Sequence, residues 1–385
     1  MIGLKVYTSR RTMPPYKTAF RPSNSKLERF MKVRTLPPGK KNAILAPHVV
    51  IVGAGASIAA YNHWGKVGRP LPSMQNLIDV LELRKEIESR GYSVDKMDFE
   101  AFYDDLATSN SDVELKKIIE QRTYEYFSGL ELPNRPTIYD YLVLSLRNKD
   151  LIASFNWDPF LLQAYRRNGD KGVGSLPGIA FLHGNVLVGV CHADKVCGLN
   201  GTCCSKCGTN FVSSQLLYPV KHKDYASDPF ISSEWDRLRD CLSRAYFLTI
   251  FGYGAPKTDV EARRLMLEVW QENHHLELAQ VEIIDIKPRD ELEATWNEFF
   301  IKQHYMVRTD VTKGYLFQHP RRSCDALAAA TLMNKPWQDN PFPVFGSLTE
   351  LRDWVTPLIE EEARLDDLAE PFSGKPLAPN VEAVL

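Results

Sequence analysis

Short apolar runs alternate with segments of helical periodicity along most of this chain. Five runs are almost continuously apolar, as buried strands are, and they cover residues 48–52, 150–157, 178–184, 246–254 and 281–288. Helical spacing is found at 73–88, with Ser73 as its expected N-cap, and at 112–130, 137–148, 159–169, 232–245 and 260–273. This alternation predicts an α/β fold with a Rossmann-like parallel sheet and helices on both of its faces.

The chain divides into a central domain and two extensions. Residues 1–43 form a basic N-terminal extension with several prolines, and 44–300 hold the predicted sheet. The stretch of about 97–150 is helical throughout and is expected to be an insertion in this domain. The stretch of about 186–215 is a small cysteine-rich lobe. Residues 301–385, with many prolines and an acidic helix, are expected to be a C-terminal extension used in assembly.

Composition narrows the class of protein. Of 385 residues, 44% are apolar and 25% charged, as is usual for a soluble globular protein. No stretch approaches the roughly 18 uncharged apolar residues of a membrane span. The N-terminus lacks the apolar region of a secretory signal, so we expect a cytoplasmic protein. The seven cysteines are odd in number and clustered, which favours a metal site over a disulfide framework.

Charge is unevenly distributed although the net charge is only −1. Residues 1–41 hold eleven Lys or Arg and one acid, Glu28, whereas 350–370 holds eight acids and two basic residues, Arg352 and Arg364. The basic arm could contact nucleic acid, dock on the acidic tail of the same or a neighbouring subunit, or act as an organellar transit peptide. It could equally be a solvated arm that orders on assembly.

Two glycine-containing loops follow predicted strands. Gly53 and Gly55 come directly after the first strand, and Gly252 and Gly254 end the fourth. A first glycine permits a tight turn, and a second lets the backbone approach a pyrophosphate at a helix N-terminus. The G-x-G-x-x-G fingerprint is incomplete because Ile58 occupies its last position. A sharp turn into a packed helix is therefore the alternative interpretation.

Polar residues end the remaining predicted strands. Asn156 lies in "FNWD", His183 in "HG", and Asp285 ends the fifth strand. Ligands of parallel sheets bind at the carboxyl ends of the strands, where these side chains would gather. Taken singly, the asparagine could form a turn, the histidine could end a strand, and Asp285 could be a solvated acid instead of a partner for ribose hydroxyls.

The cysteine cluster has the thiolates for a tetrahedral zinc site. The set that the spacing favours is Cys191, Cys197, Cys204 and Cys207, with Cys203 as a substitute. Four thiolates leave no open coordination position, so the zinc would be structural. A reduced, metal-free loop or a local disulfide is the alternative. His192 is an outside candidate for a ligand, and Cys241 and Cys324 are expected to be ordinary buried thiols.

The order of these motifs over residues 46–290 resembles the sirtuin family. In that family a "GAG-x-S" loop cradles NAD, an "N-x-D" motif borders the nicotinamide ribose, "HG" carries the catalytic histidine, and a four-cysteine zinc module follows. The resemblance assigns the first NAD-binding loop to Gly53, Ala54, Gly55 and Ser57, and the second to Gly252, Tyr253 and Gly254. It assigns the catalytic positions to Asn156, Asp158 and His183.

Three departures from the sirtuin pattern concern the acyl-peptide substrate. The Gly-Ile-Pro-Asp-Phe-Arg segment of deacylases is replaced by "GRPLPSMQNL", and the Phe-Gly-Glu-type segment by "YPVKHKDYASDP". Phe155 replaces the glutamine before the N-x-D motif. A dinucleotide site without a peptide track is similar to the sirtuin-like NAD-hydrolysing modules of bacterial anti-phage defence. Those modules work with Argonaute-like, sensor or ATPase partners.

The expected function is therefore that of an NAD hydrolase, which releases nicotinamide and ADP-ribose. His183 would polarise a ribose hydroxyl or the attacking water, and Asn156 would orient that water. Asp158 would stabilise the developing cation or fix its loop, and we favour the loop. A homo-oligomer or a partner protein would restrain the activity. The alternatives are an NAD-dependent protein deacylase and an NAD or ADP-ribose sensor without turnover.

Overall fold

The structure of the protein is a computed structural model. It describes residues 21–22, 46–63, 68–95, 97–169, 176–221, 223–256, 259–273, 275–300, 304–331 and 338–366. Apart from 21–22, the basic N-terminal extension lies outside the described residues, so its proposed contacts stay predictions. In the parts of the chain that are described, no helix has the length and apolar character needed to cross a membrane.

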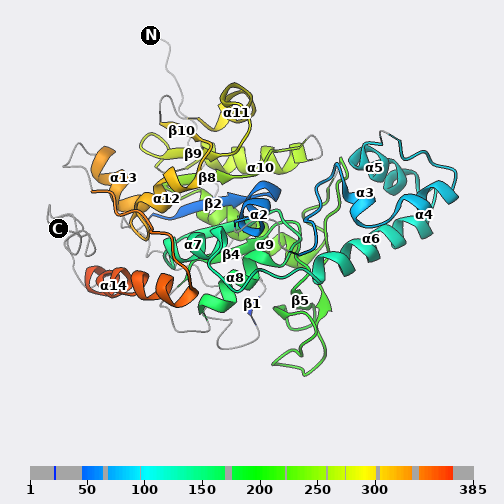
Figure 1. The fold of residues 1–385 in the computed structure, drawn as a ribbon, viewed down its shortest axis with the longest axis horizontal. Helices are drawn as coiled ribbons and strands as arrows, with labels where there is room; N and C mark the ends of the chain where they lie inside the picture. The colour runs from blue at the N-terminus through cyan, green and yellow to red at the C-terminus, as the bar shows by residue number, and fades with distance from the viewer. Residues whose placement is uncertain are drawn as a thin grey trace, which may run out of the picture.

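A six-stranded parallel sheet forms the centre of the molecule (Figure 1). Its strands, in spatial order, are β10 (Tyr305–Arg308), β9 (Gln280–Ile284), β8 (Phe247–Phe251), β2 (His48–Val52), β3 (Leu151–Ser154) and β4 (Gly178–Phe181). Every residue of β2, β3, β4, β8 and β9 is buried, which explains why these strands are almost continuously apolar. The predicted fold class is confirmed.

The strand order reverses direction at β2. From β2 the chain proceeds to β3 and β4 on one side, and later from β8 to β9 and β10 on the other. Because parallel crossovers are right-handed, this reversal places the two sets of connecting helices on opposite faces. The connecting helices are α2 (Ala54–Tyr61), α7 (Ile138–Ser145), α8 (Phe160–Gly169), α9 (Pro229–Leu242), α10 (Val260–Gln271) and α11 (Arg289–Trp296). The crevice of such a sheet opens between the carboxyl ends of β2 and β8.

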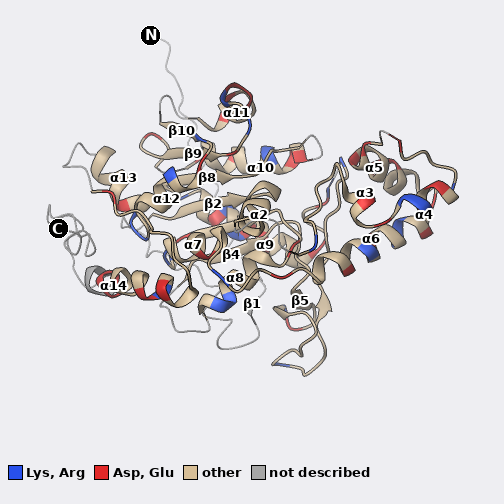
Figure 2. Cartoon of the chain, in the orientation of Figure 1, with Lys and Arg blue, Asp and Glu red and all other residues tan. Residues whose placement is uncertain are grey.

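A helical lobe projects away from the sheet, on the right of Figure 1. It consists of α3 (Leu77–Val80), α4 (Arg84–Ser89), α5 (Phe99–Ser109) and α6 (Val113–Ser128). The single helix expected over 73–88 is broken, because Glu82 has a left-handed φ of 54° between α3 and α4. Figure 2 shows acidic and basic residues interspersed along α4 and α6. On α4, Arg84 and Glu88 form an ion pair at 3.5 Å. The lobe thus begins before residue 97, and α7 packs with α2 and α8 instead.

The cysteine-rich segment forms a second, smaller sheet. Its strands are β1 (Arg21–Pro22), β6 (Val196–Leu199), β5 (Val188–Cys191) and β7 (Val212–Ser213), in that spatial order. The hairpin of β5 and β6 is antiparallel, whereas β1 pairs with β6 in parallel. A small lobe therefore stands where the cysteine spacing predicts one, between β4 and α9.

The expected boundary at residue 300 falls inside the sheet. β10 pairs with β9 and completes the six strands, and η2 (Asn297–Phe299) precedes it. The chain continues through η3 (Val311–Lys313), α12 (Tyr315–Gln318), α13 (Ser323–Thr331) and α14 (Leu348–Asp366). α12 and α14 both pack on α7. Residues 304–331 and 338–366 are thus built into the domain, and the role of the C-terminal extension in assembly stays a prediction.

Candidate active site

The two glycine loops lie against each other at the carboxyl edge of the sheet. The amide of Gly55 donates to Gly252 O at 2.9 Å. A Cβ at Gly53 would come within 2.6 Å of Tyr253 Cα, and one at Gly55 within 2.8 Å of Gly252 Cα. Gly252 also has a left-handed φ of 61°. These glycines let the two loops approach each other, and their approach to a pyrophosphate stays a prediction.

The N-terminus of α2 keeps the character of an anion site. Gly53 is its N-cap, and since glycine has no side chain, no side-chain bond caps the helix. The first turn contains no acidic residue. The amide of Gly55 already donates to Gly252 O, but no acidic side chain in the first turn opposes the partial positive charge of the helix N-terminus, which suits a phosphate group. Ser57 points elsewhere: it is buried, and its Oγ lies 2.8 Å from Tyr139 OH.

Asn156 joins the end of β3 to the start of α2. The two hydrogens of its Nδ2 face three acceptors, Gly53 O at 2.8 Å, Ser57 Oγ at 2.9 Å and Tyr139 OH at 3.2 Å. These bonds fix the amide plane and use only its nitrogen. The oxygen Oδ1 is left as the atom that could orient a water molecule. Tyr139, on α7, is a site residue that sequence reasoning missed, because no motif includes it.

Asp158 is buried at the start of α8. Its Oδ1 accepts from the amide of Phe160 at 3.1 Å, and its main-chain oxygen accepts from Asn185 Nδ2 at 2.7 Å. Burial raises the pKa of the Asp158 carboxyl to about 6, while a hydrogen bond from Ser57 lowers it. These bonds hold the loop that carries Asn156, which favours the loop-fixing role over direct stabilisation of a cation.

His183 lies just beyond β4 and is buried. Its Nε2 is 3.3 Å from Tyr225 OH, and the edge of the ring meets Phe155 with centroids 4.8 Å apart. Burial lowers the pKa of His183 to about 4; Asp259 raises this pKa and Lys223 lowers it. The imidazole is consequently neutral at physiological pH, and the neutral ring is the form that can accept a proton.

Phe155, Tyr225, Tyr253, Lys223 and Asp259 surround His183, and we call these surroundings the histidine pocket. An aromatic stack borders the pocket. The rings of Phe155 and Tyr253 are parallel within 2° and their centroids lie 4.1 Å apart. Tyr253 OH donates to Asp259 Oδ2 at 3.0 Å. Lys223, Tyr225 and Asp259 were not identified from the sequence, where Asp259 shows only as an acid before the helix at 260–273. The loop after β8 thus reaches the histidine pocket through Tyr253, which contacts Phe155 and Asp259.

Gly254 and Asp285 lie farther along the same edge. Gly254 has open surroundings, since a Cβ there would approach nothing closer than Lys287 Nζ at 4.0 Å. Asp285 follows β9, and its Oδ1 accepts from the amide of Lys287 at 3.1 Å. Among the described contacts, none joins the Asp285 side chain to the glycine loops. Its part in ribose binding stays a prediction.

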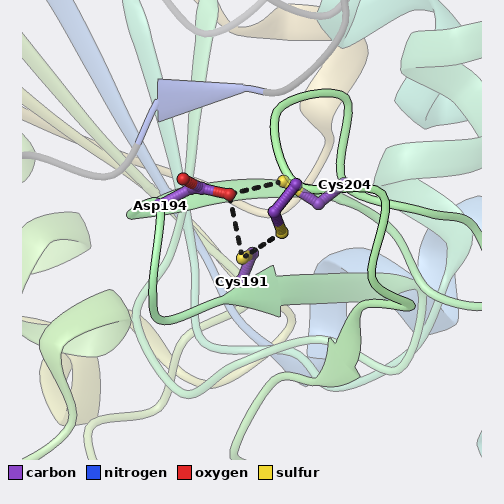
Figure 3. A group of neighbouring side chains, drawn as sticks. Cys191, Asp194 and Cys204 are labelled. Carbon is purple, nitrogen blue, oxygen red and sulfur yellow. Dashed lines mark hydrogen bonds between the residues drawn. The ribbon is translucent and has the colours of Figure 1, made fainter.

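Four side chains in the cysteine lobe have the arrangement of a metal site. Cys191, Asp194, Cys204 and Cys207 offer ligand atoms that all lie within 4.8 Å of one another. Figure 3 shows Asp194 pointing toward Cys191 and Cys204, with its Oδ2 3.6 Å and 3.2 Å from their sulfurs. Cys191 Sγ and Cys207 Sγ are 3.7 Å apart, near the about 3.8 Å between thiolates of a tetrahedral zinc site with 2.3 Å bonds. The donor set fits zinc.

Cys197 is not in this group, which corrects the predicted ligand set. In the hairpin, Cys197 pairs with Val190, while Cys191 pairs with Val196. Successive side chains of a strand point to opposite faces, so Cys191 and Cys197 face opposite sides of the hairpin. Cys197 is packed in the main hydrophobic core, and burial raises the pKa of its thiol to about 12. Asp194, in the turn between β5 and β6, takes its place.

The other predicted ligands also lie outside the group. Cys203 is exposed, and its Sγ bonds to Asn210 Oδ1 at 3.1 Å. His192 is exposed and is not among the four clustered residues. Cys241 and Cys324 are buried thiols, as expected.

Comparison with known proteins gives matches among solved structures alone. No family model matches the chain, and no curated relative matches it. A structure on the mechanism and regulation of Sir2 enzymes is 14% identical, covers 75% of this chain and 93% of its own, and has a TM-score of 0.36. A Sir2 homologue–NAD complex is 14% identical over 74% of this chain and 90% of its own, with a TM-score of 0.38.

A Sir2 homologue–ADP-ribose complex is also similar. It is 14% identical, covers 76% of this chain and 97% of its own, and has a TM-score of 0.34. Identities and TM-scores of this size carry no argument about function. The solved structures that this chain is similar to are thus Sir2 enzymes and their NAD and ADP-ribose complexes, and its function has to be argued from the site itself.

Proposed function

We propose that the chain is an NAD hydrolase that cleaves the bond between nicotinamide and ribose. The observation that carries this proposal is the convergence of four strand ends at one edge of the sheet. The loops after β2 and β8 contact each other, and Asn156 after β3 bonds to the β2 loop. His183 after β4 meets Phe155, the neighbour of Asn156. The two glycine loops, Asn156 and His183 are thus linked by contacts, which supports their assignment to one site.

The residues suit hydrolysis by positioning. The glycosidic bond breaks with its electron pair going to nicotinamide, which leaves as a neutral ring, and positive charge develops on the ribose. A water oxygen then bonds to that ribose carbon, and its proton passes to the neutral imidazole of His183. Asn156 Oδ1 would hold this water, since both hydrogens of Nδ2 are engaged by Gly53 O, Ser57 Oγ and Tyr139 OH. The N-terminus of α2 would take the pyrophosphate.

The segment after the cysteine lobe supports water as the acceptor in place of an acylated peptide. Tyr218 stands in the stretch that replaces the peptide-binding motif of deacylases. Its ring packs on Trp157 with centroids 4.8 Å apart and stacks on Tyr103 at 5.0 Å. Its hydroxyl donates to Glu120 O on α6 at 3.1 Å. This segment is thus tied to the helical lobe by the contacts of Tyr218.

A structural zinc ion in the cysteine lobe belongs to the same proposal. Cys191, Asp194, Cys204 and Cys207 would hold it, and a filled tetrahedral site supplies rigidity without chemistry. The lobe leads directly from His183 to the Tyr218 segment, and Leu217 N donates to His183 O at 3.0 Å. Bracing this lobe would therefore steady both sides of the histidine pocket.

A hydrolase that depletes NAD has to be restrained in the cell. We propose an effector role in anti-phage defence, controlled by a homo-oligomer or by an ATPase, Argonaute-like or sensor partner. The departures "GRPLPSMQNL" and "YPVKHKDYASDP" support this type over a deacylase. The basic arm within residues 1–41 is the segment that we propose for assembly, and its deletion should change the molar mass in solution.

The direct test is nicotinamide release from NAD by the purified full chain. Wild-type protein should release nicotinamide and ADP-ribose in equal amounts without an acyl peptide. His183→Ala and Asn156→Ala should each lower the rate by roughly 10²–10⁴-fold. Release that requires an acylated peptide would instead indicate a deacylase, and NAD binding without release in any condition would indicate a sensor.

A further inference from the structure

The histidine pocket contains a buried ion pair that the motif residues leave unexplained. Lys223 Nζ lies 2.5 Å from Asp259 Oδ1, and the two side chains are only 3% and 6% exposed. Taking two charges out of water costs more than it returns unless the geometry is good and the remaining atoms are bonded. Such a pair beside a candidate catalytic histidine calls for a role of its own.

The Asp259 carboxylate is turned into the pocket. Asp259 occupies the N-cap position of α10, where an aspartate usually accepts from the first helical amides, but its side chain makes no capping bond. Its Oδ2 accepts from Tyr253 OH at 3.0 Å, and its Oδ1 lies 3.9 Å from His183 Nε2. Lys223 and Tyr253 thus hold the carboxylate close to the imidazole.

We infer that Asp259 is the positioning residue of His183 in the proposed NAD hydrolysis, on which this inference rests. Nε2 carries the resting proton and faces Asp259, and Nδ1 accepts the proton that the attacking water loses. The imidazolium that forms then donates from Nε2 to Asp259 Oδ1. One proton moves from water to the ring and no other co-reactant takes part.

The resting geometry suits a partner that acts once the ring is charged. A separation of 3.9 Å is too long for a hydrogen bond, and the nearer partner of the neutral ring is Tyr225 OH at 3.3 Å. A positive charge on His183 would attract the carboxylate in this water-poor pocket. Among the described residues of the pocket, Asp259 favours the charged ring and Lys223 opposes it, while Tyr225 and Tyr253 are neutral phenols.

The test measures the proton affinity of His183 directly, by NMR of the full chain with labelled histidine rings. The variants are Lys223→Met, Asp259→Asn and the double variant, which removes both charges and guards against misfolding from one buried charge. Glu282→Gln is the matched control, because Glu282 is a fully buried carboxylate paired with a cation, Arg308, outside this pocket. His183→Ala assigns the signal, and the nitrogen shifts report which ring nitrogen carries the proton.

Lys223→Met should raise the pKa of His183 by roughly one unit or more, and adding Asp259→Asn should reverse the rise. Wild type should show the proton on Nε2. Asp259→Asn should lower kcat for nicotinamide release by roughly 10²-fold with little change in KM. Glu282→Gln should match wild type in both readouts.

Equal pKa values in Lys223→Met and the double variant, or a proton on Nδ1 at rest, would overturn the inference. So would an Asp259→Asn variant that changes KM alone. If wild type releases no nicotinamide, the proposed function fails. The NMR titration would still decide whether Asp259 and Lys223 set the proton affinity of the ring, so the two failures can be told apart.

Discussion

Two buried histidines lie at opposite ends of the same sheet and are held very differently. His48 begins β2 at the amino edge, where its Nδ1 is 2.7 Å from Ser323 Oγ and its Nε2 is 2.7 Å from Thr249 Oγ1. His183 follows β4 at the carboxyl edge, where its Nε2 has one long contact, 3.3 Å to Tyr225 OH. Both ring nitrogens of His48 are satisfied by short bonds, whereas His183 retains the capacity to bond to something else.

The difference shows why burial and a lowered pKa do not by themselves identify a catalytic residue. Burial lowers the pKa of His48 to about 3 and that of His183 to about 4, so both rings are neutral. His48 also stacks on Phe247, with centroids 4.4 Å apart. A histidine with both nitrogens bonded and one face covered is a structural residue. Open hydrogen-bonding capacity distinguishes His183.

The surroundings of the two edges differ in the same way. At the amino edge, Arg321 donates to both oxygens of Glu362 at 2.8 and 2.6 Å and to Leu146 O at 2.8 Å, which ties α14 to the end of α7. Arg147 adds a further pair with Glu362 at 3.1 Å. At the carboxyl edge, the one buried pair beside His183, among the described residues, is that of Lys223 and Asp259. Buried ion pairs thus hold elements together at the amino edge, whereas the buried ion pair at the carboxyl edge lies beside the His183 ring.

The largest expected effect is a separation of activity from stability between the two histidines. His183→Ala should lower nicotinamide release by roughly 10²–10⁴-fold and should lower the denaturant midpoint less than His48→Ala does, because His183 loses one long polar contact and His48 loses two short ones. His48→Ala should retain turnover per folded molecule. Rate assays and urea unfolding on the same samples check this. Comparable losses of rate in both variants would break the comparison.

The next effect is on the amino edge itself. Glu362→Ala removes the shared partner of Arg147, Arg321 and Arg322 and leaves their charges buried. The free energy of unfolding should fall by about 3–5 kcal/mol. Glu360→Ala, at an exposed position on the same helix, is the control and should change the free energy of unfolding little. Urea denaturation gives both values, and equal effects would show that α14 is not held by this network.

The cysteine lobe gives a test with a metal readout. Protein purified with zinc should contain about one ion per chain, and Cys204→Ser or Asp194→Asn should lower that content. Cys197→Ser should keep the ion, because Cys197 faces the other side of the hairpin. Elemental analysis of each variant decides between the two ligand sets. Loss of zinc in Cys197→Ser with retention in Asp194→Asn would restore the set predicted from spacing.

The smallest effect is a change in the pH dependence of stability. The pKa of His48 is about 3 when folded and 6.5 ordinarily, so the unfolded chain binds more protons between these values. Its contribution to stability is therefore present above pH 6.5 and is lost as the pH falls toward 3. His48→Ala should flatten the acid limb by up to about 1.4 kcal/mol per pH unit. Asp158, whose pKa is raised, changes the stability in the opposite direction with pH. The pH dependence of stability is therefore compared between wild type and His48→Ala.

The sequence by itself determined the parallel sheet and most of the helices that connect its strands. Continuous apolar runs such as "HVVIV" can be buried on both faces only in a parallel sheet, and helical periodicity between them sets the crossovers. It also placed Asn156 and His183 at strand ends, because the carboxyl ends of parallel strands share one edge. The helix expected over 73–88 was wrong, since periodicity does not reveal the left-handed residue Glu82.

Tertiary structure decided which side chains meet. In the β5–β6 hairpin, Cys197 pairs with Val190, so its side chain faces the hydrophobic core while Cys191 faces Asp194 on the other side. Residue spacing alone does not fix this register of the two strands. Two segments far from His183 in the sequence, one with Lys223 and Tyr225 and one with Asp259, surround its ring. No local sequence pattern predicts such contacts. Likewise, only packing shows that His48 is saturated and His183 is not, because hydrogen-bonding capacity is spent on partners that folding supplies.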